Sequence, residues 1–188
     1  MSNNKLIAML FLFSTFSTNT LAADIRPIGL IGAYLGGENL VETTASDLDA
    51  GGLLYFGGGI LVEQQESNLS FQATLGYKFD YVDFYTSFGP GDATISSLPL
   101  ELTAYIRNNN IRIGGGIAYH IDPEYEFCVD SLGCDHYNFD DALGLIAELS
   151  IDLQQLAFIG FRYTNIDYEI YGASIDASNF GVNIGVKF

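Results

Sequence analysis

Apolar and polar residues alternate along most of the chain, and the last nine residues show the pattern clearly. In FGVNIGVKF every second residue from Phe180 to Phe188 is apolar, and glycine, asparagine and lysine stand between them. A period of two residues is the signature of a β-strand whose two faces meet different surroundings. The pattern therefore predicts a protein built of strands.

Eight segments alternate in this way, and they predict an all-β protein. They span residues 25–36, 52–63, 68–80, 95–107, 110–121, 140–152, 155–168 and 177–188. Several are longer than the about five or six residues that are usual in globular proteins. Their length suits tilted strands that cross a bilayer, which need about 9–11 residues each.

The connections between these segments alternate in length. Short connections lie at 64–67, 108–109 and 153–154, and long ones at 37–51, 81–94, 122–139 and 169–176. Turns at one end and long loops at the other are typical of outer-membrane barrels. We therefore predict an eight-stranded, antiparallel, up-and-down transmembrane β-barrel with its long loops outside the cell.

The polar positions of the strands indicate which face lines the barrel. A soluble barrel of the lipocalin type keeps its apolar set inside and needs dense charges outside. Here the polar set mixes a few charges with many small residues, which suits the narrow lumen of an eight-stranded barrel. Because unpaired charges there would be costly, we expect Glu101, Arg112, Glu148 and Arg162 to form a charge network across the lumen.

Aromatic side chains near the strand ends support a membrane-spanning barrel. Rings at the depth of the lipid headgroups form girdles around such barrels. The residues expected in these girdles are Tyr34, Tyr77, Phe79, Tyr119, Tyr163 and Phe188.

The first 22 residues have the features of a secretory signal peptide. Lys5 precedes an apolar run at 6–13, and small residues follow up to Ala22 and Ala23. This apolar run is too short to span a bilayer, which needs about 20 residues. We expect cleavage after Ala22, or after Ala23 as the second choice, which leaves residues 23–188 as one barrel domain.

The chain is strongly acidic, with 23 Asp and Glu against seven Lys and Arg and a net charge of −16. Such a charge argues against nucleic acid as a partner, because phosphate contacts need clustered Lys and Arg. Many acids lie in the long connections: Glu38, Glu42, Asp47, Asp49, Asp83, Asp92, Asp122, Glu124, Glu126, Asp130, Asp135, Asp167, Glu169 and Asp176. One interpretation is that they are ordinary solvated loop charges. The other is that they form a binding surface, which meets either lipopolysaccharide phosphates through divalent cations or a basic partner directly.

Cys128 and Cys134 are the two cysteines of the chain, in the acidic stretch EFCVDSLGCDHYN. Two cysteines in an exported protein most often form a disulfide, and we predict one here. A metal site is the alternative. We favour the disulfide because a metal needs more ligands, and only His136 and some Asp lie near in the sequence.

The chain resembles the small outer-membrane β-barrel proteins of Gram-negative bacteria, the OmpA/OmpX-like superfamily. The signal peptide, the eight strands, the loop asymmetry and Phe188 carry this resemblance, together with the runs LGYKFD, PLELTAYI, GGGIAYHI and FRYTNIDYE. It implies the outer membrane as location, with membrane lipid and lipopolysaccharide as surroundings. A last strand ending in Phe188 is similar to the signal read by the barrel assembly machinery.

Catalytic residues and cofactor-binding or metal sites are not predicted. Some barrels of this superfamily modify lipid A, and such an enzyme needs a nucleophile beside a base. We interpret His120 as a structural residue and His136 as an exposed loop residue, and eight strands leave no open pore. The sequence predicts a monomeric barrel with a non-enzymatic envelope or surface-interaction role. A lipid A-modifying enzyme and a soluble periplasmic ligand-binding barrel stay open as alternatives.

Overall fold

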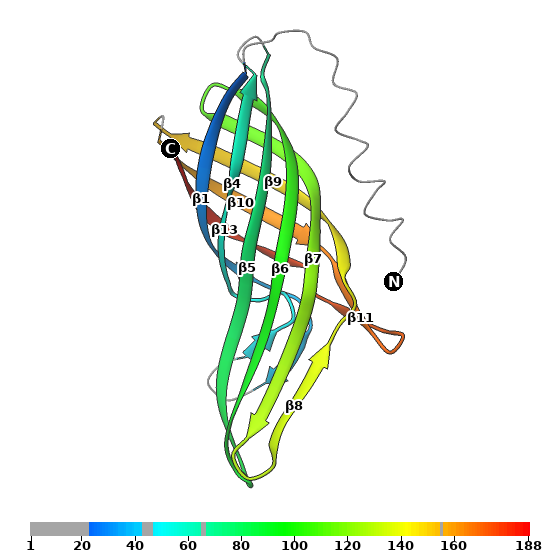
Figure 1. Ribbon diagram of the computed structural model, residues 1–188. Helices are drawn as coiled ribbons and strands as arrows, with labels where there is room; N and C mark the ends of the chain where they lie inside the picture. The colour runs from blue at the N-terminus through cyan, green and yellow to red at the C-terminus, as the bar shows by residue number, and fades with distance from the viewer. Residues whose placement is uncertain (1–22, 43–46, 65–66, 155) are drawn as a thin grey trace.

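Eight long antiparallel strands close into a ring (Figure 1). The computed structural model describes residues 23–42, 47–64, 67–154 and 156–188, so the predicted signal peptide lies outside the described residues. In ring order the strands are β1 (Ala23–Leu35), β4 (Leu54–Gln64), β5 (Leu69–Thr86), β6 (Gly89–Asn108), β7 (Ile111–Val129), β9 (Ala142–Leu153), β10 (Ala157–Asn165) and β13 (Asn179–Lys187). The predicted eight-stranded β-barrel is confirmed.

Pairing between the first and last strands closes the barrel. Ile31 of β1 lies opposite Ile184 of β13, and the pairing extends from Ile28 to Leu35 along β1. Closure satisfies the backbone N–H and C=O groups that would otherwise be exposed at the edges of a sheet. Within the described residues there is no helix with the length and apolar character needed to cross a bilayer.

The two ends of the barrel differ. The short connections after β4, β6 and β9 lie at one end of the barrel, which we call the turn end. The first strand of the ring, β1, begins at this end, and the last strand, β13, finishes there (Figure 1). The other end is the loop end. Its hairpins are formed by β2 (Asn39–Glu42) with β3 (Asp47–Asp49) and by β11 (Asp167–Ile170) with β12 (Ala173–Asp176), while β8 (Gly133–Asn138) pairs with β7.

The prediction of long loops at 81–94 and 122–139 was wrong for most of these residues. β5 and β6 continue as a hairpin to Thr86 and Gly89, and β7 continues to Val129 before β8 turns back beside it. In Figure 1, β5, β6 and β7 extend well beyond the ring. They do so because their alternation persists, with Val82 and Phe84 on one face of β5.

The apolar face of each ring strand points outward. Ile113 is 63% exposed, whereas its neighbour Arg112 is fully buried inside the barrel. The same contrast holds on β9, where Leu149 is exposed and Glu148 is buried. This orientation is the one the sequence predicts for a barrel surrounded by lipid.

Aromatic rings fill much of the barrel interior, and glycines on neighbouring strands make room for them. A Cβ atom added to Gly76 would lie only 2.3 Å from the Tyr55 ring. A Cβ atom added to Gly185 would lie only 2.1 Å from the Phe158 ring, so neither position has room for a larger residue. Tyr34, which we expected in an outer girdle, is 3% exposed and points into the interior. Its parity along β1 sets this direction, because it alternates with exposed Ala33 and Leu35.

A β-bulge marks the level at which the ring ends and the loop-end extension begins. The register between β6 and β7 shifts between Ser96 and Leu98, and Asp122 opposite this point has a positive φ of 45°. A bulge places an extra residue on one strand, so the faces of β7 exchange sides there. On the turn-end side of the bulge His120 points inward, and on the loop-end side Tyr125 and Phe127 do.

Candidate functional site

The elements beyond the ring at the loop end pack together into a folded unit, which we call the cap. It comprises residues 36–53, 80–96, 122–142 and 166–178, as far as these are described. Its buried core contains Leu48, Ala50, Val82, Phe84, Ala93, Ile95, Val129, Phe139, Ala142, Ile166, Tyr168 and Ala177. The stacked rings of Phe84 and Phe127, 4.9 Å apart, hold the extended strands β5 and β7 together, and the rings of Phe139 and Tyr168, 5.6 Å apart, join the β11–β12 hairpin to this core. The long connections therefore form a structured surface.

Charge is distributed unequally between the barrel and the cap. The cap sequence contains no Lys or Arg, yet it holds most of the 23 acidic residues of the chain. In addition to the predicted loop acids, it includes Asp80, Asp140 and Asp141. The basic residues after Lys5 are all on ring strands: Arg26, Lys78, Arg107, Arg112, Arg162 and Lys187. The cap therefore presents an almost purely negative surface with a single histidine, His136.

Large side chains are exposed at the tips of the cap. Tyr85 is 88% exposed and Phe88 63% exposed in the β5–β6 hairpin, and Leu132 is 68% exposed in the β7–β8 hairpin. The two tips are joined, because the Asp130 backbone N–H donates to the Pro90 carbonyl at 3.1 Å. Exposed apolar side chains held on a rigid support are a common feature of interaction surfaces.

Three of the four residues predicted for the lumen charge network meet in the centre of the barrel. Arg162 on β10 donates through Nη1 to Glu101 Oε2 at 2.6 Å and lies 2.6 Å through Nη2 from Glu148 Oε2. Thr74 also donates to Glu101 Oε2, at 2.9 Å, and Ser150 donates to Glu148. All of these side chains are buried, so the network closes the lumen with paired charges.

Arg112 does not join this central network. The register of β7 against β9 places Gly114 opposite Glu148, so Arg112 lies two residues nearer the turn end. Its Nε is 3.4 Å from Asp152 Oδ1, and its guanidinium lies 4.3 Å from the centre of the Phe158 ring. The stagger of neighbouring strands in a barrel, which alternation does not reveal, separates Arg112 from the other three.

A second charge network occupies the turn end. Lys187 donates to Asp152 Oδ1 at 2.9 Å, and Arg107 donates to Glu63 Oε1 at 2.7 Å. Arg26 pairs with Asp24 and lies 3.9 Å from Glu63. The alternation of residues does not predict this network, although its members lie at or next to the ends of predicted strands. It leaves the turn end close to charge balance, in contrast to the cap.

His120 lies buried at the junction of barrel and cap. Its Nδ1 is 3.2 Å from Ser97 Oγ and 2.7 Å from the Tyr168 hydroxyl. Burial raises the pKa of Tyr168 to about 12, so this hydroxyl keeps its proton and can donate to the ring. A serine partner for His120 could not be predicted from the sequence, because Ser97 lies on the neighbouring strand β6.

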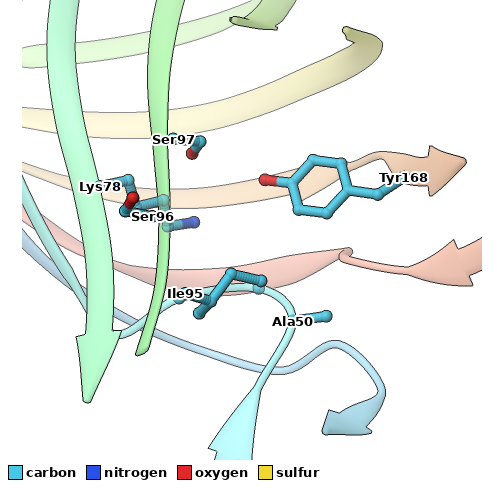
Figure 2. Close-up of a pocket in the computed structure, with 8 residues that line it drawn as sticks. Ala50, Lys78, Ile95, Ser96, Ser97 and Tyr168 are labelled. Atoms are coloured by element: carbon cyan, nitrogen blue, oxygen red, sulfur yellow. The ribbon is translucent and has the colours of Figure 1, made fainter. Parts of the chain in front are cut away.

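The surroundings of His120 do not favour catalysis. Ser97 and His120 are 4% and 2% exposed, and among the described residues no carboxylate lies within hydrogen-bond distance of the ring. Figure 2 shows Lys78, Ser97 and Tyr168 around a space too small to hold a water molecule. Ligand pockets usually measure about 300–1,000 Å³. The cluster therefore fits the structural role predicted for His120.

The predicted Cys128–Cys134 disulfide is confirmed. The two cysteines lie opposite one another in the β7–β8 hairpin, with Cα atoms 4.1 Å apart. His136 lies on the same hairpin, and its Nδ1 is 3.5 Å from Glu124 Oε1 and 3.8 Å from Glu126 Oε2. His136 is exposed, as predicted.

Comparison with known proteins identifies the fold but no family, because no family model and no curated sequence matches the chain. Neisserial surface protein A is 10% identical, with a TM-score of 0.53 over 89% of this chain and 99% of that protein. Ail, the attachment invasion locus protein of Yersinia pestis, in complex with the heparin analogue sucrose octasulfate, is 13% identical, with a TM-score of 0.54 over 88% and 97% of the two chains. The chain has the fold of the small outer-membrane β-barrels.

Proposed function

We propose that this protein resides in the outer membrane of a Gram-negative bacterium and displays the cap on the cell surface. Two observations support this location. Apolar side chains such as Ile113 and Ile184 cover the outside of the ring, where a soluble protein would need charges. In addition, the fold matches that of outer-membrane barrels over almost the whole described chain.

We further propose that the cap binds cationic partners and that the protein is not an enzyme. The observation that carries this proposal is the separation of charge between the two parts of the molecule. The cap is acidic and lacks Lys and Arg, whereas every Lys and Arg after Lys5 lies on a ring strand of the barrel. A one-signed surface attracts partners of opposite charge over about a Debye length and speeds their association. The exposed tip residues Tyr85, Phe88 and Leu132 would add apolar contacts.

Location and partner charge can be tested on the same cells. The protein should sediment with the outer membrane, require detergent for extraction, and migrate differently on gels before and after heating because the closed barrel resists unfolding. Recovery from the aqueous periplasm without detergent would refute the membrane location. Cells that display the protein should bind a small basic protein, cytochrome c, more strongly than cells without it.

Charge variants of the cap make the binding test specific. Asp130, Asp135 and Glu169 are exposed, so changing them to Asn, Asn and Gln removes three charges from the surface. Cytochrome c binding should fall several-fold at low salt, and the difference should vanish at about 1 M salt, where the Debye length is about 3 Å. The variant D130E/D135E keeps the charge and should bind like the wild type. Equal binding by the triple variant and the native cap would refute a role for the acidic surface.

Lipopolysaccharide and the assembly machinery are proposed as further contacts of a monomeric barrel. Because the cap has no Lys or Arg to meet lipopolysaccharide phosphates, such contacts would run through divalent cations and should be lost when the cations are chelated. Phe188 is 76% exposed beside the last ring strand, where the assembly machinery could recognise it. Phe188→Ala should slow insertion without changing the stability of the inserted barrel.

A further inference from the structure

The disulfide hairpin carries four metal-binding side chains on one face. In the pairing of β7 with β8, Cys128 lies opposite Cys134, and Glu126 lies opposite His136. The two pairs are two residues apart on each strand, so all four side chains point to the same side of the hairpin. The sequence places both Glu126 and His136 near the cysteines, but only the strand pairing shows that the two lie opposite one another on the same face.

The donor atoms of three of these residues already lie close together, and His136 lies beside one of the three. Cys128 Sγ is 3.4 Å from Glu126 Oε1, and Glu126 Oε2 is 3.8 Å from His136 Nδ1. The donor atoms of Glu126, Cys128 and Cys134 all lie within 4.8 Å of one another. Around a tetrahedral zinc ion with bonds of about 2.0–2.3 Å, neighbouring ligand atoms stand about 3.3–3.8 Å apart. Small side-chain rotations would therefore suffice for Glu126, Cys128 and Cys134 to reach one ion, and His136, beside Glu126 on the same face, would have to turn toward them as the fourth ligand.

We propose that, when the Cys128–Cys134 disulfide is reduced, the hairpin binds one zinc ion through Glu126, Cys128, Cys134 and His136. Two thiolates, an imidazole and a carboxylate are ligands that zinc prefers, and they suit it better than calcium or magnesium. The hairpin lies at the surface, so an ion can enter from solvent.

The disulfide and the metal site exclude one another, because sulfurs bonded to each other cannot serve as thiolate ligands. Reduction by a phosphine cleaves the S–S bond, yields two thiols and converts the phosphine and one water molecule into the phosphine oxide. Zinc then replaces the two thiol protons, which are released to solvent. The same hairpin is thus closed either by an S–S bond or by an S–Zn–S bridge.

Cobalt provides a spectroscopic test on the full-length protein in detergent micelles. The protein is reduced with a phosphine, freed of reductant without oxygen, and titrated with Co²⁺. We expect one equivalent to produce thiolate-to-cobalt charge-transfer absorption, which Zn²⁺ abolishes by displacing Co²⁺. The oxidised protein should show no such absorption. A reduced protein without these bands would overturn the proposal.

Variants test the four ligands separately. The double change of Cys128 and Cys134 to Ser should abolish the charge-transfer bands, while His136→Ala and Glu126→Ala should each weaken Co²⁺ binding at least tenfold. Asp135→Ala is the matched control, because Asp135 lies on the same hairpin opposite Phe127, on the other face, and should bind Co²⁺ like the wild type. If Glu126→Ala and His136→Ala bind normally, the four-ligand assignment is wrong. Heat-dependent gel mobility would verify that each variant retains its barrel.

Discussion

The barrel and the cap are built from the same strands with opposite polarity. Along β5, Thr74 and Lys78 point into the barrel while Leu75 points out, but farther along Val82 and Phe84 point inward and Asp83 points out. The barrel is polar inside and apolar outside, and the cap has the order of a soluble protein. A β-strand fixes only that faces alternate, and the solvent around each part decides which residues the outer face must carry.

The largest effect should come from breaking the central ion network of the barrel. Arg162→Ala leaves Glu101 and Glu148 buried without their cation, and removing one partner of a buried pair costs about 3–5 kcal/mol. Urea unfolding of the protein in lipid vesicles, followed by heat-dependent gel mobility, would measure the loss. Arg107→Ala at the more exposed turn end should cost no more than about 1 kcal/mol. Equal losses would contradict the assignment of the central network.

The corresponding change in the cap removes an apolar side chain. Phe84→Ala should destabilise the cap by about 3–5 kcal/mol, because it leaves a cavity beside Phe127. Hydrogen exchange should show faster opening of the cap amides, while the heat-dependent mobility of the barrel stays unchanged. Tyr171→Ala, at a side chain that is 98% exposed, should change neither property. Loss of the closed barrel in Phe84→Ala would show that the two parts are not separable.

A charge on the outer face should act differently in the two parts. Ile184→Arg places a guanidinium in the lipid-facing belt and should cost about 2–4 kcal/mol at the bilayer midplane. Tyr85→Arg introduces the same side chain on the outward face of the cap and should leave stability within about 0.5 kcal/mol. Vesicle unfolding measures both. Normal insertion and stability of the Ile184 variant would contradict the outward orientation of β13.

Packing of rings against glycines should have a smaller effect. Gly185→Ala places a methyl group against the Phe158 ring and should cost about 1–3 kcal/mol through overpacking. Gly29→Ala meets its nearest side-chain atom at 3.7 Å and should be nearly neutral. Combining Gly185→Ala with Phe158→Leu should recover part of the lost stability if the ring causes the clash. An equal cost at both glycines would contradict this origin.

The smallest effect concerns one tyrosine of the cap. The Tyr81 hydroxyl donates to Asp83 Oδ1 at 2.5 Å, and this bond raises the pKa of Tyr81 to about 12. Because the folded-state pKa exceeds the ordinary value of 10.0, the bond stabilises fully below pH 10 and is lost as pH rises through 12. Absorbance titration of the wild type against Tyr81→Phe would isolate this group. In Asp83→Ala the pKa should return toward 10, and an unchanged value would contradict the bond as its cause.

The sequence predicted the features that depend on local alternation. The eight strands, the outward direction of Ile113 and the inward direction of Arg112 all follow from a period of two and from the residue types on each parity. The disulfide followed from the presence of two cysteines in an exported chain. The acidic character of the cap followed from composition in the same way.

Only the tertiary structure decided which distant residues meet. Strand stagger joined Arg162 to Glu101 and Glu148 and kept Arg112 apart, and it brought Ser97 and Tyr168 to His120 from different strands. Tertiary packing also made the predicted loops at 81–94 and 122–139 part of a folded cap. The face of β5 that carries Val82 and Phe84 is buried there against residues from other hairpins. Alternation is a property of one strand, whereas register, bulges and closure arise between strands, and these set the distances on which the chemistry depends.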